Sequence, residues 1–139
     1  MSADFLDTNV LVYSFDPGAP AKRDYSRKLI RSALADHTAV ISYQVVQEFL
    51  NIAMRKFLVP MTATQGERYL DTVLIPLCAV WPSQSLYGSA LQIASETGFG
   101  FYDSLIITSA IQASCKRLLT EDHHDGQVVR GVEIVNPFR

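Results

Sequence analysis

Short apolar, β-prone runs alternate with longer segments of helical periodicity along most of the chain. The clearest example is AVISY at 39–43, followed by YQVVQEFLNIAMRKF at 43–57, where apolar residues recur at helical spacing. Further strands are predicted at 77–81, 117–120 and 132–135, and further helices at about 64–75, 82–97 and 103–115. This alternation predicts an α/β fold whose parallel sheet is covered by helices on both faces.

The length of 139 residues predicts a single domain spanning 1–139. Hydrophobic residues make up 48% and charged residues 19% of the chain, which is the composition of a folded protein. The sequence has no apolar run of the roughly 20 residues that a membrane helix needs, and MSADFLD lacks the basic start of a signal peptide. Cys78 and Cys115 are isolated, so we expect buried, reduced thiols in a cytoplasmic protein without membrane contact.

A formal net charge of −2 does not by itself indicate a nucleic-acid-binding protein. One segment is nevertheless basic, because Arg23, Arg27 and Arg31 step by four residues and so share one face of a predicted helix. Such a face is most often merely solvated. The alternative is that it contacts the phosphates of a nucleic acid.

Acidic residues follow two of the predicted strands. Asp7 comes directly after Phe5 and Leu6, which resemble the end of a buried strand, and Glu121 and Asp122 come directly after RLLT at 117–120. Ligands of open parallel sheets bind beyond the carboxyl ends of the strands. We therefore expect these acids to meet at one rim of the sheet.

Two further acids occupy unusual positions. Glu48 shares one side of its predicted helix with Val45 and Ile52, although an unpaired buried carboxylate costs several kcal/mol or takes up a proton. Asp103 stands at or just before the first turn of its helix, after GFGFY at 98–102. Alone, Asp103 would be interpreted as a helix N-cap, a position that Asp fills well.

A cluster of such acids needs a positive partner, because like charges within about 4–6 Å raise one another's pKa. No Lys or Arg adjoins Asp7, Glu48 or Asp103 in the sequence. Mg²⁺ is the natural partner, since it prefers carboxylate and water oxygens. Zinc is disfavoured because no cysteine or histidine pair has ligand spacing. His123 and His124 are interpreted as exposed loop residues rather than ligands.

Four motifs in this order resemble those of PIN-domain nucleases, and specifically of VapC-type toxins. They are FLDTNVLVY at 5–13, VVQEFLN at 45–51, FYDSLIITSA at 101–110 and LLTEDHHDGQ at 118–127, and VEIVNPF at 132–138 is similar to one branch of the family. The similarity extends over essentially the whole chain. It implies a PIN-like three-layer sandwich with a central, mostly parallel sheet, and a ribonuclease that requires Mg²⁺ or Mn²⁺ and leaves a 5′-phosphate.

The resemblance also implies roles for individual residues. The acidic quartet of the family matches Asp7, Glu48, Asp103 and Asp122. Asp7 and Asp103 would be the central metal ligands. Glu48 and Asp122 would complete the site, bind a second ion, or accept a proton from the attacking water.

Other positions have supporting roles in this interpretation. Asn9 and Thr120 match polar positions that orient the ligands by hydrogen bonds. Glu121 is expected to point away from the site, and Asp125 is a further acid and metal-ligand candidate that only some family members share. RNA would be guided to the site by Arg23, Arg27 and Arg31, with further candidates at Arg55, Lys56, Lys116 and Arg117.

The same resemblance implies three partners: an RNA substrate, a small antitoxin that covers the active site, and a second copy of the chain in a homodimer. Two alternatives remain open at this stage. One is a phosphatase with Asp7 as a covalent nucleophile, although that chemistry usually has a second acid two residues on, where this chain has Asn9. The other is a catalytically silent PIN-fold module that binds RNA or protein.

Overall fold

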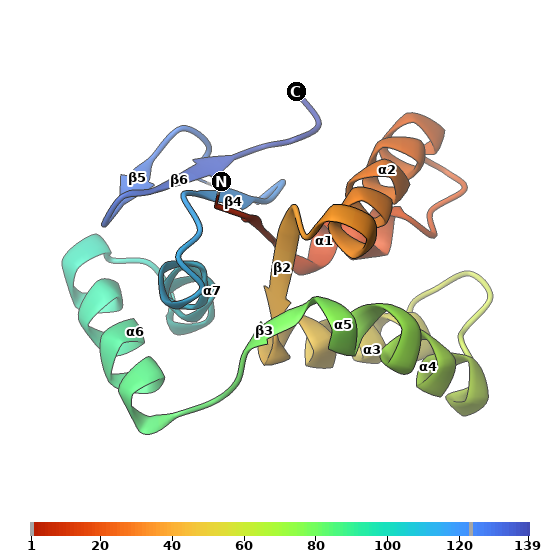
Figure 1. The fold of residues 1–139 in the computed structure, drawn as a ribbon, viewed down its shortest axis with the longest axis horizontal. Helices are drawn as coiled ribbons and strands as arrows, with labels where there is room; N and C mark the ends of the chain where they lie inside the picture. The colour runs from red at the N-terminus through yellow and green to blue at the C-terminus, as the bar shows by residue number, and fades with distance from the viewer. Residues whose placement is uncertain (1, 123) are drawn as a thin grey trace.

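A six-stranded sheet forms the centre of the molecule in the computed structural model, which describes residues 2–122 and 124–139. Its strand order is β3-β2-β1-β4-β6-β5, and all neighbouring strands are parallel except β5 and β6. The strands are β1 (Asp4–Leu6), β2 (Ala39–Ser42), β3 (Cys78–Val80), β4 (Arg117–Leu119), β5 (Val128–Val129) and β6 (Val132–Val135). The α/β fold with a mostly parallel sheet is thus confirmed (Figure 1).

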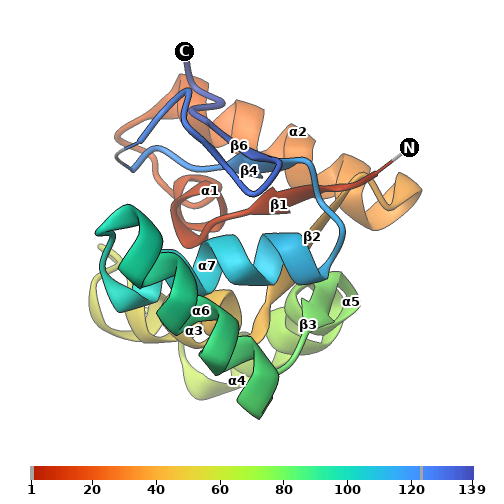
Figure 2. The ribbon, with the colours of Figure 1, turned by 90° about the vertical axis from the view of Figure 1, so that its left-hand side faces the viewer.

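Helices cover both sides of this sheet. Figure 2 shows α2 on one side and α7, backed by α6, on the other. The helical segments are α1 (Thr8–Tyr13), α2 (Pro20–Asp36), α3 (Tyr43–Arg55), α4 (Ala63–Tyr69), the π-helical turn η1 (Leu70–Leu74), α5 (Ile75–Leu77), α6 (Gln84–Thr97) and α7 (Phe101–Gln112). The helix predicted at 64–75 is therefore three consecutive segments.

The strands supply the centre of the core. Phe5 and Leu6 of β1 are fully buried, and so are Ile41 of β2 and Phe49 of α3. Residues from six different elements complete the same cluster: Leu11, Ile30, Leu74, Ile93, Ile107 and Leu118. Because β1 lies between β2 and β4, its carboxyl end opens at the middle of one sheet edge.

Two sequence predictions need correction here. The helix predicted to begin at residue 103 begins at Phe101, with Gly100 as its cap residue. Asp103 therefore lies in the first turn and not at the N-cap, in a position where a negative charge is favoured by the helix dipole. Cys115 is buried as predicted, but Cys78 is only half-buried; both are free thiols.

Strand β5 was not predicted. It pairs with β6 through a two-residue turn, in which Arg130 and Gly131 both have positive φ (48° and 85°). Such turns match the twist of a two-stranded hairpin. Among residues 2–122 and 124–139, none of the helices combines the length and apolar character that crossing a membrane requires.

Candidate active site

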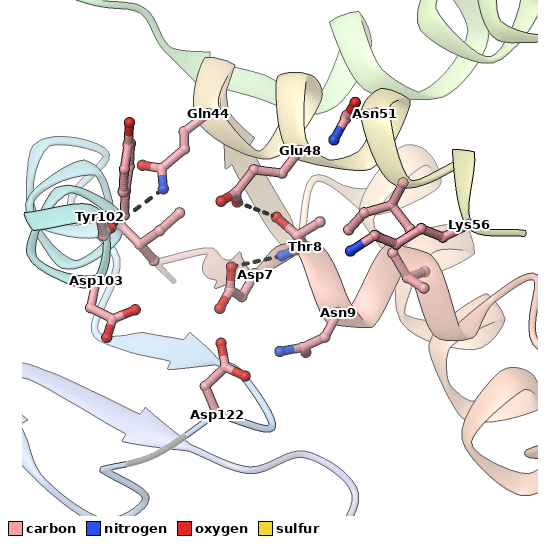
Figure 3. A pocket seen from close by; sticks show the side chains of 13 residues that line it. Asp7, Thr8, Asn9, Gln44, Glu48, Asn51, Lys56, Tyr102, Asp103 and Asp122 are labelled. Atoms are coloured by element: carbon pink, nitrogen blue, oxygen red, sulfur yellow. Dashed lines mark hydrogen bonds between the residues drawn. The ribbon is translucent and has the colours of Figure 1, made fainter. Parts of the chain in front are cut away.

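Four acids from separate parts of the chain line one pocket of about 450 Å³ (Figure 3). Asp7 follows β1 and caps α1, Glu48 lies on α3, Asp103 lies on α7, and Asp122 follows β4. In Figure 3 the carboxylates of Asp103 and Asp122 point toward Asp7. The structure therefore brings all four predicted quartet residues to the carboxyl edge of the sheet.

Asp7 is the most deeply placed of the four, with 9% of its surface exposed. Its Oδ1 accepts a hydrogen bond from the Thr8 N–H (2.7 Å), and its Oδ2 accepts one from the Thr120 hydroxyl (2.8 Å). Burial raises the pKa of Asp7 to about 7, and the charges on Asp122 and Glu48 act in the same direction, against the two hydrogen bonds. Asp7 therefore sits where a negative charge is costly without a cation.

Thr120 joins Asp7 to the loop that carries Asp122. Its hydroxyl donates to Asp7 and accepts from the Asn9 side-chain amide (3.1 Å) and from the Asp122 N–H (3.1 Å). The single proton and both lone pairs of this hydroxyl are thus engaged. Asn9 also accepts from the Glu121 N–H (3.3 Å), which fixes the start of the same loop.

Thr8 is a residue of the site that the sequence interpretation missed. Its hydroxyl donates to Glu48 Oε1 at 2.7 Å, and this bond links α1 to α3 across the pocket. The only local signal for it is its place directly after Asp7, at the start of the helix. Its partner is forty residues away in the sequence, so spacing alone could not reveal the contact.

The acids resemble a divalent-metal site in chemistry and charge. None of the ion pairs between described residues involves Asp7, Glu48, Asp103 or Asp122. Their oxygen donors are those that Mg²⁺ and Mn²⁺ prefer. As the side chains stand, no three His, Cys, Asp or Glu residues of the described chain are close enough to enclose a metal. The carboxylate oxygens are nevertheless a donor set that fits such an ion.

The two neighbouring acids of the TED sequence have different surroundings. Glu121 does not line the pocket; its Oε1 accepts from Lys22 Nζ at 2.8 Å. Burial acts to raise the pKa of Glu121, but Lys22 and the Tyr13 hydroxyl hold it below its usual value. Asp122, one residue later, has its carboxylate directed into the pocket.

Asp125 lies outside the pocket as well. Its carboxylate accepts from the Asn136 N–H (2.8 Å) and from Arg139 (3.1 Å), both near the C-terminus. A role for Asp125 as a metal ligand stays a prediction without support from its contacts.

The two histidines of this loop differ in what can be said of them. His123 lies outside the described residues. His124 is half-buried rather than exposed, and its ring stacks on Phe99 at a centroid distance of 3.8 Å. It lines a crevice of about 20 Å³ that shares Asp7, Asp103 and Asp122 with the main pocket.

The basic residues proposed to guide RNA fall at several places. On α2, the Arg27 Nε donates to the Ser14 carbonyl (2.7 Å), and Arg23 pairs with Asp24. Arg31 lines a separate hollow beside Phe15 and Tyr69. None of the three arginines lines the acidic pocket, so their contact with RNA stays a prediction.

The other basic candidates differ in their position relative to the pocket. Arg117 makes two hydrogen bonds to Asp4 at the amino end of β1, and Lys116 directly precedes β4 at the same edge. Arg55 is exposed at the end of α3 and does not line the pocket. Lys56, the next residue, does line it.

Comparisons with known proteins identify the family and the fold of the chain. The model of the PIN domain family matches residues 5–128. No curated protein matches the chain. The fold is similar to a chain of a toxin–antitoxin complex from Klebsiella pneumoniae, with a TM-score of 0.67 and 21% identity over 98% of both chains.

Two more solved structures have the same fold. A chain of VapBC2 from Rickettsia felis, bound to a DNA fragment from its promoter, gives a TM-score of 0.66 and 17% identity over 95% of this chain and 96% of that one. A chain of FitAB bound to an IR36 DNA fragment gives a TM-score of 0.63 and 23% identity over 98% of this chain and 96% of that one. The fold and the site define this protein as an α/β sandwich with acids at the carboxyl edge of its sheet. The chain belongs to the PIN domain family.

Proposed function

We propose that this protein is a divalent-metal-dependent ribonuclease, the VapC-type toxin of a toxin–antitoxin pair, acting in the cytoplasm as a single-domain chain. The observation that carries the proposal is the position of Asp7. This carboxylate is buried, its pKa is raised to about 7, and three more acids line the same pocket without an ion-pair partner among the described residues. A structural role alone does not explain why a fold would gather uncompensated charge there.

Asp7 and Asp103 are the residues that would hold the ion, which is Mg²⁺ or Mn²⁺. Such an ion, when bound, lowers the pKa of a water ligand and neutralises charge on phosphate oxygens. Asp7 is held ready for this role because the Thr8 N–H and the Thr120 hydroxyl each fix one of its oxygens. The same hydroxyl connects Asp7 with the backbone at Asp122, so the two acids keep their relative position.

Glu48 and Asp122 are the groups available to take a proton from the attacking water or to extend the ligand set. The Thr8 hydroxyl orients Glu48 Oε1, and the other carboxylate oxygen of Glu48 faces the pocket. Hydrolysis of an RNA phosphodiester in this arrangement would leave a 5′-phosphate on one product. A metal-free pocket of four acids repels a polyanion, so metal binding would precede RNA binding.

The similar solved structures support a protein partner for this chain by analogy. Two of the similar solved structures are described as a toxin–antitoxin complex and as VapBC2. By analogy, this chain would bind a small antitoxin that covers the acidic pocket. It would also form a homodimer.

The experiment that tests the proposal is cleavage of total RNA by the purified protein in Mg²⁺ or Mn²⁺, with and without a chelator. We expect cleavage with metal and none with chelator. Calorimetry at millimolar metal should show binding to the wild-type protein. RNA binding without cleavage under any metal would indicate a silent binding module instead, and the absence of metal binding would refute the proposed site.

A further inference from the structure

One wall of the acidic pocket has a different chemistry from the rest. It is formed by α3, which places Gln44, Asn51, Ile52 and Lys56 along the pocket. Among the described residues that line this pocket, Lys56 is the only one with a positive charge. A pocket built only to hold a metal needs no such cation.

The ammonium group of Lys56 has no partner that accounts for it within the described part of the chain. It takes part in none of the ion pairs or side-chain hydrogen bonds there. Its backbone is fixed, since the Lys56 N–H donates to the Ile52 carbonyl at 2.7 Å at the end of α3. Figure 3 shows its ammonium directed toward the pocket, on the side away from Asp103.

The spacing along α3 keeps Lys56 apart from the acid of the same helix. Glu48 and Lys56 are eight residues apart and so lie on one face, about 12 Å from each other along the helix axis. The two side chains form no ion pair. A chain of phosphates passing from the acids along α3 would meet Lys56 next.

Gln44 gives a second, independent sign of a polar ligand on the same wall. The side chain is 4% exposed, and its Nε2 donates to the Tyr102 carbonyl at 3.3 Å. Its Oε1 is buried and has no hydrogen-bond partner in the described chain. A buried acceptor of this kind is normally satisfied, and a turn of the side chain toward the pocket would let a ligand N–H or O–H complete it.

We propose that the α3 wall is a nucleotide subsite in which Lys56 binds a phosphate adjacent to the one that is hydrolysed. This inference rests on the proposed function, because it takes RNA as the substrate. The competing explanation is that Lys56 only complements the negative end of the α3 dipole. In that case its removal would change stability and leave RNA affinity as it was.

The first test measures binding of a short single-stranded oligoribonucleotide in Ca²⁺ in place of Mg²⁺, because carboxylate oxygens also bind Ca²⁺, and a gel confirms that the oligomer stays intact. Lys56→Met removes the ammonium and keeps an unbranched side chain, and Lys56→Arg keeps the charge. Lys28→Met is the matched control, because it makes the same change of charge at an exposed position of α2 that does not line the pocket. We expect Lys56→Met to weaken binding about fivefold to tenfold at low salt and to reduce the salt slope by about 0.7, which is the loss of one phosphate contact.

The second test locates the phosphate. Each linkage of the oligomer is replaced in turn by a neutral methylphosphonate, and binding is measured to the wild type and to Lys56→Met. At one position the neutral linkage should weaken wild-type binding as much as Lys56→Met does and should not weaken the mutant further. Non-additivity of this kind identifies a direct contact.

The third test uses cleavage kinetics in Mg²⁺. A phosphate that does not react is bound equally in the ground state and the transition state, so Lys56→Met should raise KM about tenfold with kcat nearly unchanged. Lys56→Arg should restore KM, and Lys28→Met should match the wild type.

The outcomes separate this inference from the proposed function. If the wild type cleaves RNA and Lys56→Met behaves like Lys28→Met, the subsite is refuted and the nuclease stands. A fall in kcat at constant KM would also refute it, because Lys56 would then act at the reacting phosphate. If RNA binds in a Lys56-dependent way but is never cleaved, the phosphate contact of Lys56 holds and the nuclease proposal fails. A wild type that neither binds nor cleaves RNA would refute both.

Discussion

The two ends of strand β1 carry aspartates with opposite surroundings. At the amino end, Asp4 receives two hydrogen bonds from Arg117, Nε to Oδ1 at 3.0 Å and a terminal nitrogen to Oδ2 at 2.6 Å. At the carboxyl end, Asp7 receives bonds only from neutral donors and faces three more acids. The strand is three residues long, so one short element places one neutralised and one unneutralised carboxylate at opposite edges of the sheet.

The same contrast recurs one strand away, between two adjacent residues. Glu121 pairs with Lys22, whereas Asp122 points into the acidic pocket without an ion pair among the described residues. The fold can therefore supply a cation to an acid on either edge. The four acids of the pocket have no such cation paired with them in the described part of the chain, which indicates that their charges are available for a ligand. Making the same substitution at both ends of β1 tests this difference in charge compensation.

The largest effect should be on activity. Asp7→Asn and Asp103→Asn each remove a proposed metal ligand at almost constant size, so RNA cleavage should fall by at least about 10²-fold in each. Asp4→Asn makes the identical change three residues from Asp7 and should leave cleavage within about twofold of the wild type. Rates measured on one RNA substrate at saturating Mg²⁺ compare the three. Equal losses in Asp4→Asn and Asp7→Asn would remove the distinction between the two edges.

The second effect is on stabilisation by metal. A ligand that binds only the folded protein at 100 times its Kd adds about 2.7 kcal/mol, which is a rise in Tm of about 10 °C for a chain of this size. We expect this rise in the wild type and in Asp4→Asn, and a much smaller one in Asp7→Asn. Thermal melts with and without Mg²⁺ measure it. A full response in Asp7→Asn would mean that Asp7 serves as a cap of α1 and not as a ligand.

Whether the sequence alone predicts a contact depends on whether a general rule of the fold places both residues. Asp7 and Asp122 could be placed at one rim because each follows a strand and parallel strands end at the same edge. The contact between Thr8 and Glu48 and the ion pair between Lys22 and Glu121 could not, since no rule of parallel sheets brings these helical residues to their partners. Such pairs depend on how α1, α2 and α3 pack, which periodicity does not specify.

The misplaced boundaries also have physical reasons. Gly98 and Gly100 together indicate a break, but only the backbone shows that the helix restarts at Phe101 rather than at Asp103. Strand β5 has only two residues, and its turn contains Arg130 at a positive φ, which the sequence favours only weakly through Gly131.

The third effect is on the metal-free protein. Asp7→Asn removes a carboxylate whose charge is opposed by burial and by neighbouring acids, so at pH 8 in chelator it should raise Tm by about 4 °C, or about 1 kcal/mol. The opposite sign, a clear loss of stability, would show that the hydrogen bonds to Asp7 outweigh the repulsion.

The pH dependence of the wild type provides the internal check. In the folded, metal-free protein the pKa of Asp7 is about 7, against 3.8 as its ordinary value, so folding takes up a proton between these two pH values. The contribution of Asp7 to stability is therefore present at low pH and is lost as the pH rises through that window. The gain from Asp7→Asn should accordingly shrink as the pH is lowered from 8 toward 5, because protonation already removes the charge from the wild type.

The smallest effect belongs to the amino end of β1. Asp4→Asn weakens its pair with Arg117, but the arginine is half exposed, so the pair contributes only about 0.5–1 kcal/mol and Tm should fall by about 2–4 °C. This loss should be independent of Mg²⁺ and of pH between 6 and 8, and 0.5 M NaCl should reduce it because exposed pairs are screened. A double-mutant cycle with Arg117→Met isolates the interaction. The coupling free energy should be similar to the loss of stability caused by Asp4→Asn alone. A coupling of zero would mean that the two acids of β1 differ in location but not in how their charge is compensated, and the contrast between the edges would then rest on Asp7 alone.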